Sequence, residues 1–187
     1  MEALIIVDAQ NEFSSQGRRP VPNHAQALET IHRRVEEARS EGRPIAWVRH
    51  HNRPEEFPAF APGSWGAEFS PGLGPLPGRD EEAEFVKNVY GAFTGTDIGS
   101  WLETRGAHEV LLVGFFVHMC VSTTAREALM RGVHVAVDPA GTGGFPIQHE
   151  LLGAQSAAEV HRTALLHLSH LGVTITSTDT EHRWSAE

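Results

Sequence analysis

The sequence predicts an α/β protein, a three-layer α/β/α sandwich built around a mostly parallel, six-stranded sheet of the Rossmann-like kind. Short apolar runs alternate along the whole chain with longer segments in which apolar residues recur every three or four positions. Several of the short runs are apolar at consecutive positions, which is typical of parallel strands covered on both faces. Because such sheets bind ligands outside the carboxyl ends of their strands, functional residues are expected at that edge.

The expected strands are short and apolar, and in chain order they span 3–9, 44–50, 84–88, 109–116, 133–144 and 173–178. The first reads "ALIIVDA", an apolar run that closes on an acid, and the fourth reads "EVLLVGFF", the clearest buried strand. The fifth runs into a glycine-rich segment, "PAGTGGF" (139–145). We interpret this segment as a flexible rim of an active site. A phosphate-binding loop is the alternative, although the segment matches neither the dinucleotide fingerprint nor the Walker A pattern.

The expected helices span 23–42, 96–106, 120–132 and 149–172, the last of them either continuous or broken. In the first of them, apolar residues recur from Ala27 to Ala38 on one face, Asn23 is a candidate N-cap and Gly42 a candidate C-terminal stop. Between the second and third strands, residues 52–81 are rich in proline and glycine. Long irregular segments of this kind in compact domains are often functional.

Length and composition narrow the classes of function. The 187 residues fit a single domain spanning 1–187, and the formal net charge of -9 argues against nucleic acid or an anionic membrane as a partner. The single cysteine excludes an intrachain disulfide framework and favours the cytoplasm. The N-terminus lacks the basic segment and cleavage site of a signal peptide, and no apolar run approaches the ~20 residues that cross a bilayer.

Three polar residues stand where expected strands end. Asp8 closes the first strand, Lys87 closes the third, and Cys120 follows the fourth after a short turn and opens a helix. Since the carboxyl ends of parallel strands share one edge, an acid, an amine and a thiol are expected within contact distance. A helix N-terminus and a neighbouring ammonium both lower the pKa of a thiol, and a carboxylate can take the thiol proton. The free N–H groups of the turn can stabilise an oxyanion.

Each of these residues also has a structural interpretation. A lone cysteine is more often a small buried hydrophobe than a nucleophile. Taken singly, Asp8 at a strand end is expected to cap a neighbouring loop, and Lys87 to be a solvated amine. The joint placement of Asp8, Lys87 and Cys120 is what favours the catalytic interpretation.

Three ordered motifs carry a resemblance to a known family. They read "IIVDAQNEF", "VKNVYGAFTGTDI" and "VGFFVHMCVSTTAREALMRG". In order and spacing they are similar to the aspartate, lysine and nucleophile motifs of the isochorismatase-like cysteine hydrolases, which include nicotinamidases and N-carbamoylsarcosine amidohydrolases. The agreement spans residues 3 to 138. The turn departs from the family pattern, because Phe116, Val117 and His118 stand where the family often has Ala-Thr-Asp.

The resemblance implies a triad of Asp8, Lys87 and Cys120 that works without a cofactor. Cys120 would attack a carbonyl and form a thioester acyl-enzyme, which water then hydrolyses. The resemblance also implies a non-proline cis peptide between Phe116 and Val117, which would aim the N–H groups of Val117 and Cys120 at the oxyanion. A homo-oligomer, a dimer or a tetramer, is expected as well.

Apolar side chains of the motifs and of the long loop predict the walls of a pocket. The candidates for substrate binding are Phe13, Trp65, Tyr90, Phe93, Phe116 and His118. Each aromatic residue is also a candidate for the core, and Trp65 and Phe93 are candidates for a contact with a partner chain. The sequence assigns no catalytic role to His118.

We expect no metal. Metal-dependent nicotinamidases carry an Asp-x-His after the second strand, and here Val48 stands two positions before His50. Neighbours on a strand point to opposite faces, so His50 and His51 are poor joint ligands. The histidines of the last expected helix, His167 and His170 among them, are interpreted as helix surface or as a subunit contact.

The predicted function is hydrolysis of a C–N bond in a small amide or carbamoyl-type compound by a cysteine nucleophile. Isochorismatase-type ether hydrolysis is one alternative, which does not require the cysteine. The other is a catalytically silent member of the fold that binds a ligand or senses redox state through Cys120.

Overall fold

The computed structural model describes residues 1–176 and has a six-stranded sheet with the order β3-β2-β1-β4-β5-β8, in which all neighbours pair in parallel. The strands are β1 (Glu2–Val7), β2 (Ile45–His50), β3 (Glu82–Lys87), β4 (Glu109–Phe115), β5 (His134–Gly143) and β8 (Thr174–Ile175). The helices are α1 (His24–Ser40), α2 (Ile98–Thr104), α3 (Ser122–Met130) and α4 (Ala157–His170). The predicted α/β sandwich with a six-stranded parallel sheet is confirmed.

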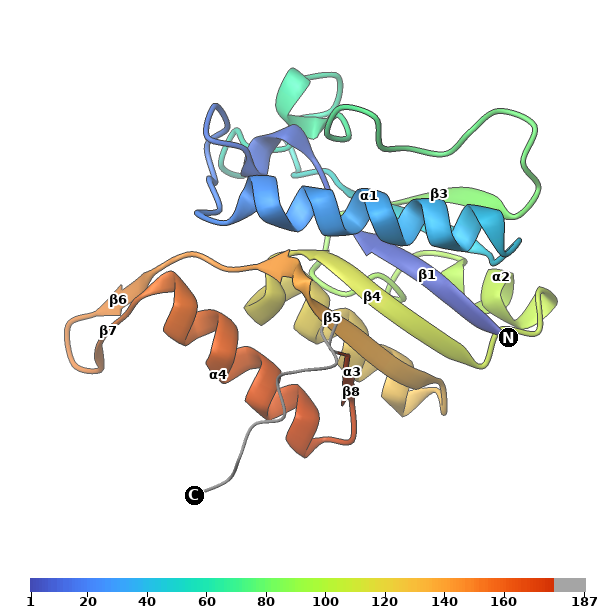
Figure 1. Ribbon diagram of the computed structural model, residues 1–187. Coiled ribbons are helices and arrows are strands. Elements are labelled where there is room, and N and C mark those ends of the chain that lie inside the picture. Colours follow the sequence, from blue (N-terminus) through green and yellow to red (C-terminus); the bar gives the residue numbers. More distant parts are fainter. Residues whose placement is uncertain (177–187) are drawn as a thin grey trace.

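Helices cover both faces of the sheet (Figure 1). On one face, α1 and part of the 52–81 segment pack on residues such as Leu4, Ile6 and Trp47. On the other face, α2, α3 and α4 pack on the alternate residues, such as Ile5 and Val7. Because β1 lies in the middle of the sheet, both sets of its side chains are fully buried, which explains its uninterrupted apolar run.

The strands β1 and β4 approach each other closely at their carboxyl ends. Gly114 is paired with Val7 and has a φ of 122°, in the region that favours glycine. A Cβ at this position would lie 1.9 Å from the carbonyl oxygen of Val7. A glycine is therefore required in the motif before the turn that carries Cys120.

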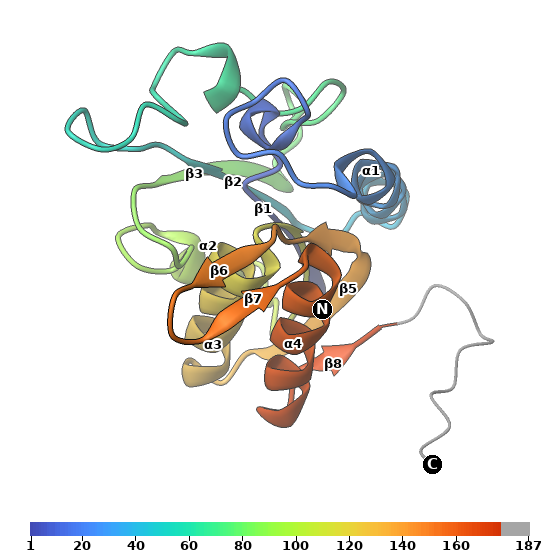
Figure 2. The same cartoon turned by 90° about the vertical axis from the view of Figure 1, so that its left-hand side faces the viewer.

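The long helix expected over 149–172 is only partly correct. Its first residues form an antiparallel hairpin instead, β6 (Ile147–His149) and β7 (Gly153–Gln155), which Figure 2 shows next to α4. Ser156 and Glu159 form a capping box that starts α4. Glycine at the hairpin turn, with a φ of 81° at Gly153, stops the helix from extending backwards.

The glycine-rich segment 139–145 is also more regular than expected. Its first five residues continue β5, and Thr142 and Gly143 pair with the end of β4. A Cβ on Gly143 would lie 2.5 Å from the side-chain oxygen of Asn23, so the segment is packed strand rather than an open loop. The last expected strand is β8, and residues 177–178 of that prediction lie outside the described residues.

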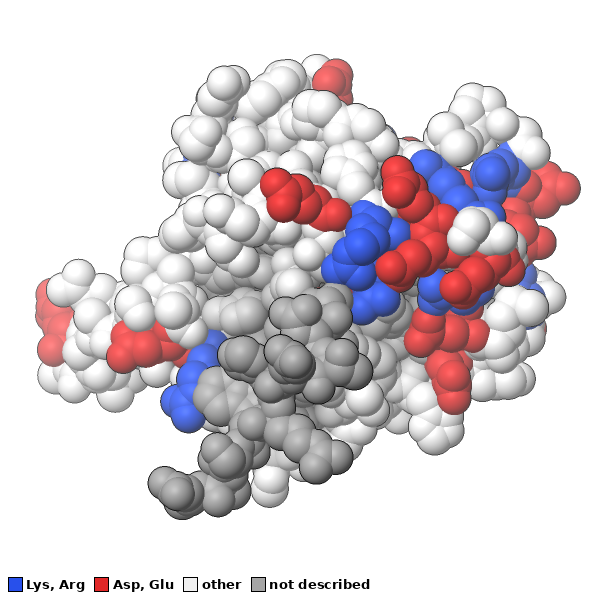
Figure 3. All heavy atoms as spheres, viewed as in Figure 1, with Lys and Arg blue, Asp and Glu red and all other residues white. Residues whose placement is uncertain are grey.

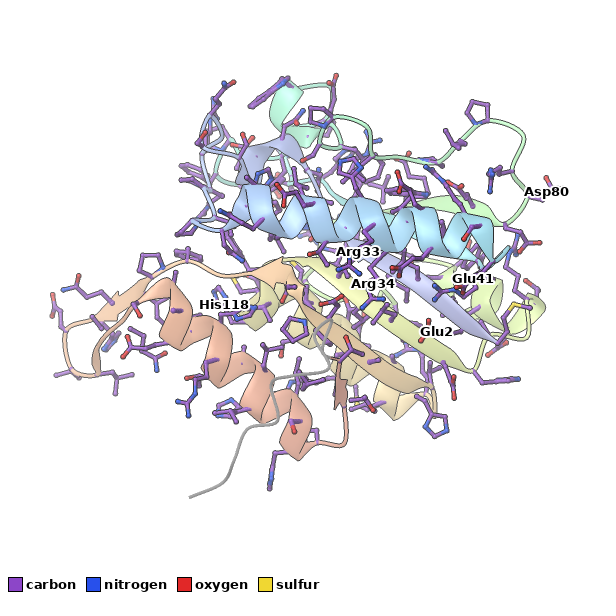
Figure 4. The ribbon with its side chains drawn as sticks, viewed as in Figure 1. Glu2, Arg33, Arg34, Glu41, Asp80 and His118 are labelled. Carbon is purple, nitrogen blue, oxygen red and sulfur yellow. The ribbon has the colours of Figure 1, made fainter. Side chains whose placement is uncertain are left out.

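Charged side chains gather over the C-terminal half of α1 and the neighbouring starts of the strands (Figure 3). Arg34 pairs with the buried Asp138 of β5 at 2.8 Å. Figure 4 shows Glu2 and Glu41 at this end of the sheet and His118 at the other, the carboxyl-end edge. Among residues 1–176, no helix is long and apolar enough to cross a membrane.

Candidate active site

The three predicted catalytic residues lie together at the carboxyl-end edge of the sheet. Asp8 follows β1, Lys87 is the last residue of β3, and Cys120 lies in a π-helical turn, η3 (Val117–Val121), between β4 and α3. Their exposed fractions are 0% for Asp8, 3% for Lys87 and 7% for Cys120. An acid, an amine and a thiol from distant parts of the chain are therefore enclosed in one buried cluster.

Lys87 is the centre of this cluster. Its Nζ donates hydrogen bonds to Asp8 Oδ2 at 2.7 Å and to Cys120 Sγ at 3.4 Å, and it lies 3.1 Å from His50 Nδ1. An ammonium has three N–H donors and no acceptor, so these three partners satisfy it fully. The strand order explains the contact with His50, because β2 lies between β1 and β3 and His50 is the direct partner of Lys87 in the parallel register.

The contact with Lys87 fixes the tautomer of His50. Since the ammonium can only donate, Nδ1 of His50 accepts and the ring proton lies on Nε2. Nε2 then donates to Asn52 Oδ1 at 2.8 Å, and Asn52 Nδ2 donates to the carbonyl oxygen of Phe57 at 2.7 Å. A continuous hydrogen-bond chain thus links Lys87 to the loop after β2.

Burial dominates the electrostatics of the cluster. It raises the pKa of Cys120 strongly, and the adjacent Asp8 carboxylate raises that pKa further, while Lys87 opposes both effects. Burial is the largest single influence on Lys87 and lowers its pKa, but the charges and hydrogen bonds of Asp8 and Cys120 together outweigh it, so the pKa lies above its usual value. Burial and the positive charge of Lys87 lower the pKa of His50, which agrees with a neutral ring. Lys87 therefore acts on the pKa of Cys120 in the expected direction, but burial and Asp8 outweigh it, and the expectation of a net lowering is wrong.

The backbone around Asp8 is specialised. Asp8 has a φ of 53°, in the left-handed region that aspartate tolerates better than most residues, and its Oδ1 has no hydrogen-bond partner among the described residues. The buried Gln10 holds the strand ends together. Its amide donates to the carbonyl oxygens of His50 and Ala67, and its Oε1 accepts from the N–H of His50.

The turn that carries Cys120 differs in one detail from the expected one. The non-proline cis peptide joins Phe115 and Phe116, one position earlier than the predicted bond between Phe116 and Val117. The physical reason is that Val117 already belongs to η3, so the chain must leave β4 before that residue. The N–H groups of Met119 and Val121 both donate to the carbonyl oxygen of Phe116. Helical backbone therefore begins at Val117, not at Cys120.

A cavity of about 510 Å³ opens above Asp8 and Cys120. Of the predicted substrate-binding residues, Phe13, Tyr90 and Phe116 line it. The other lining residues come from the 52–60 segment and from the ends of strands and the loops that follow them: Arg19, His50, Asn52, Arg53, Glu56, Phe57, Phe60, Asn88, Val89, Met119 and Phe145. Its size falls within the usual range for a small-molecule site.

Three other candidates do not line this cavity. Trp65 is half exposed near the buried Glu12, on the outer side of the loop, because η2 (Trp65–Ala67) turns it away from the strand ends. Phe93 is buried in the core under α3, where its N–H donates to Glu127. His118 packs its ring against Phe116 and Phe145 from behind. Their expected contact with a substrate does not match these positions.

His50 is the functional-site residue that the sequence analysis missed. From the sequence His50 is only a candidate metal ligand, and its position opposite Lys87 depends on the register between β2 and β3. His50 and His51 do face different cavities, as alternation on a strand predicts. Among the described residues, no group of three His, Cys, Asp or Glu side chains is arranged to hold a metal.

The comparison with protein families decides the classification. The model of the isochorismatase domain matches residues 2–180. The chain belongs to the isochorismatase family. The predicted membership of the isochorismatase-like superfamily is thereby confirmed, and family relatives include hydrolases that act as amidases.

Several relatives of the isochorismatase family are similar over most of the chain. The secreted isochorismatase effector Isc1 of Verticillium dahliae is 33% identical and aligns with 93% of this chain and 86% of its own length. The nicotinamidase/pyrazinamidase of Mycobacterium tuberculosis is 32% identical over 73% of this chain and 83% of its own. A "Probable inactive nicotinamidase" of Arabidopsis thaliana is 28% identical over 99% and 95%.

Solved structures of the family agree with the fold. An isochorismatase from Pseudomonas putida has a TM-score of 0.87, is 29% identical, and aligns over 95% of this chain and 88% of its own. Because one relative is named as secreted, the cytoplasmic location stays a prediction. The predicted dimer or tetramer also stays a prediction.

Proposed function

We propose that this protein hydrolyses a C–N bond in a small amide or carbamoyl-type compound, with Cys120 as nucleophile and a thioester acyl-enzyme as intermediate. One observation carries the proposal. Lys87 Nζ holds both the carboxylate of Asp8, at 2.7 Å, and the sulfur of Cys120, at 3.4 Å, at the floor of a substrate-sized cavity. A base, a nucleophile and a cation that stabilises charge are thus adjacent.

In the first half-reaction, Cys120 Sγ attacks the substrate carbonyl carbon. Because burial raises the pKa of Cys120, the resting thiol carries its proton, and Asp8 must take that proton as the S–C bond forms. The unpartnered Oδ1 of Asp8 is the acceptor that fits this role. When the C–N bond breaks, Asp8 passes the proton to the departing nitrogen, which leaves as ammonia or an amine.

In the second half-reaction, water replaces the amine. Asp8 takes a proton from this water, whose oxygen attacks the thioester carbon. The S–C bond then breaks, Asp8 returns the proton to Cys120 Sγ, and the acid product leaves. Each half-reaction forms and breaks one bond to the carbonyl carbon and leaves Asp8 ionised again, so no cofactor enters the balance.

Lys87 and His50 have supporting roles in this proposal. Lys87 stabilises negative charge as it moves between Asp8 and the sulfur. His50 acts as a positioning residue, because its acceptor Nδ1 occupies the third N–H of Lys87 and keeps the ammonium aimed at the other two partners. The negative charge on the substrate oxygen faces the N–H groups of the turn, with those of Val117 and Cys120 as candidates.

A catalytically silent, redox-sensing member of the family is the second candidate function. The observation that favours a silent member is the buried thiol of Cys120 with its raised pKa, because it lowers the fraction of the sulfur present as the reactive thiolate at rest. Isochorismatase-type ether hydrolysis has less support, because it does not need the complete set of Asp8, Lys87 and Cys120.

The test is ammonia release from a panel of small amides and carbamoyl compounds, followed by mass spectrometry of the protein. We expect turnover with at least one member and an acyl adduct on Cys120. Replacement of the nucleophile by Cys120→Ala should abolish both, whereas Ser122→Ala on the adjacent helix is the matched control. Turnover that survives Cys120→Ala would contradict the thioester mechanism. Absence of any turnover, together with reversible oxidation of Cys120, would support the silent candidate instead.

A further inference from the structure

The mouth of the catalytic cavity carries two arginines without ionic partners. Arg19 and Arg53 both line the cavity, and neither has a carboxylate within 4.0 Å among residues 1–176. Most arginines of the described chain do have such a partner: Arg18, Arg33, Arg34, Arg39, Arg43, Arg49, Arg79 and Arg105. Arg126, Arg131 and Arg162 also lack such a partner among residues 1–176, but of these five arginines only Arg19 and Arg53 line the cavity above Cys120.

Two loops meet to hold these arginines at the mouth. The guanidinium of Arg19 lies 4.9 Å from the ring centre of Phe57, a cation–π contact between the loop after η1 (Asn11–Phe13) and the loop after β2. Next to it, Arg18 Nη1 donates to the carbonyl oxygen of Pro58 at 2.6 Å. Arg19 is therefore anchored by its flat face, while its N–H edges remain available to a ligand.

Glu56 is the only acidic residue that lines the mouth, and it is partly engaged. Its Oε2 accepts a hydrogen bond from the backbone N–H of Arg53 at 2.6 Å. At the floor, the charges of Asp8 and Lys87 offset each other. Two arginines against one glutamate leave the mouth with an excess positive charge, on a chain whose formal net charge is -9. Local charge of opposite sign to the whole chain favours an anionic ligand.

Aromatic walls separate the mouth from the floor. Phe13 and Phe116 meet edge to face at 4.7 Å between ring centres, and Phe60 lies 5.1 Å from Phe13. Phe145 completes the wall at 4.7 Å from Phe116. A ligand that spans the cavity meets the nucleophile at one end, apolar surface in the middle and guanidinium groups at the other end.

We infer that the substrate is a bipartite amide: a carbonyl end held at Cys120, an apolar middle, and a single negative charge held by Arg19 and Arg53. The inference rests on the proposed function for the reaction at Cys120, but not for the binding of the anion. A carboxylate suits the site best, because its two oxygens match the N–H fork of a guanidinium. Glu56 disfavours a second negative charge on the same group.

The experiment measures binding without turnover, by calorimetry on the Cys120→Ala protein. The probes are benzamide, its 3-carboxy and 4-carboxy derivatives, and a matched phosphonate. At low salt, we expect one of the carboxylates to bind about tenfold more tightly than benzamide, since charge-assisted hydrogen bonds are stronger than neutral ones. The preference should shrink at about 0.5 M salt, which screens exposed charges.

Substitutions of the two arginines test whether these residues cause the preference for carboxylate probes. We expect Arg19→Gln and Arg53→Gln each to reduce the carboxylate preference several-fold while the affinity for benzamide is kept, and Arg19→Lys to restore part of it. Arg126→Gln is the matched control, because Arg126 carries the same charge on the outer face of α3 and does not line the cavity. Equal affinity for all probes, or equal loss of affinity in the Arg126 variant, would overturn the inference.

The two proposals can fail separately. Hydrolysis of neutral amides by the unmodified protein, with no carboxylate preference in binding, would reject the anion subsite and leave the amidase proposal in place. Arginine-dependent binding of a carboxylate, without hydrolysis of any amide, would support the subsite and count against the amidase. Tighter binding of the phosphonate than of the carboxylates would reject the single-charge assignment.

Discussion

Two ion pairs with buried carboxylates lie at opposite ends of β3, and they are built differently. At the start of β3, the carboxylate of Glu82 accepts from Arg39 Nε and Nη2, at 2.8 and 2.9 Å, and also from Trp47 Nε1 and the N–H of Leu76. At the other end of the same strand, Lys87 pairs with Asp8, whose Oδ1 has no partner among the described residues.

The difference lies in hydrogen-bond saturation. Both carboxylate oxygens of Glu82 accept hydrogen bonds, so neither is free to take a proton and the ion pair has a structural role. The pair of Asp8 and Lys87 is more deeply buried, yet one of its carboxylate oxygens has no partner among the described residues and lies beside a thiol and below an open cavity. Burial alone therefore does not distinguish the two pairs, whereas the unsatisfied oxygen of Asp8 does, and this oxygen supports the proposed catalytic role.

The largest expected effect is the loss of the free oxygen of Asp8. Asp8→Asn should lower amide turnover at least about 1000-fold, because the base is removed. The same change removes a charge that raises the pKa of Cys120, so alkylation of this thiol by iodoacetamide at neutral pH should become faster. Turnover and alkylation are measured on the same preparation. A parallel fall of both would indicate collapse of the cluster and not loss of a base.

A substitution in the pair of Glu82 and Arg39 should change the free energy of unfolding. Glu82→Gln keeps the shape of the side chain but leaves Arg39 without its counter-charge, which should lower the free energy of unfolding by about 2–3 kcal/mol. Denaturant titration measures this loss, and turnover per folded molecule should stay unchanged. A change in turnover without a change in stability would break the contrast between the two pairs.

His50 should give a smaller effect on turnover. His50→Leu removes the acceptor of the third N–H of Lys87, and an unsatisfied buried donor costs about 1–3 kcal/mol, which corresponds to about tenfold or more in kcat. His50→Gln restores an acceptor and should recover most of the rate. His51→Leu is the matched control, since His51 faces another cavity. Equal rates in the two His50 variants would argue against the positioning role.

The pH dependence sharpens the role of His50. Burial, and then the charge of Lys87, lowers the pKa of His50 below its usual value of 6.5, against weaker opposing contributions from Asp8, Asn52 and Glu56. His50 is therefore neutral at pH 7 and gains a proton only in more acidic solution, where it can no longer accept from Lys87. Turnover should therefore fall as His50 gains this proton at acidic pH. In the His50→Gln variant, the loss of turnover at acidic pH should be absent or should occur at lower pH. A pH–rate profile measures this difference.

The smallest change in the free energy of unfolding is expected for an ion pair at the surface. Arg33 and Glu37 form an i,i+4 pair at 3.3 Å with partly exposed side chains, and such pairs contribute about 0.3–0.5 kcal/mol. Arg33→Gln should change the free energy of unfolding by no more than this, and less at high salt. A loss as large as that of Glu82→Gln would show that burial does not govern the stabilities of these pairs.

The sequence was most informative where structure follows from strand position. Asp8, Lys87 and Cys120 could be grouped because each lies at the carboxyl end of a parallel strand or just after it, and the edge of such a sheet is fixed by topology. The contact of His50 with Lys87 could not be predicted in this way. It depends on the order of β2 and β3 in the sheet and on their register, and neither leaves a local pattern in the chain.

Other errors have equally physical causes. The pKa direction of Cys120 depends on burial, which a sequence does not measure. The hairpin before α4 has exposed, very short strands without an apolar period, although the Ser156–Glu159 capping box was readable as the true helix start. The cis peptide was placed one residue late because β4 ends at Phe115 and η3 already begins at Val117, and the sequence does not mark these bounds.

The hydrogen-bond chain from Lys87 reaches the loop after β2 through a backbone carbonyl, that of Phe57. A carbonyl group is present whatever side chain the residue carries. The loop can therefore exchange the side chains at positions 53, 56 and 57 during divergence while the same backbone group continues to orient Asn52 and His50. This separation would let descendants of one ancestor adopt new substrates by changing the rim of the cavity, without rebuilding the chemistry beneath it.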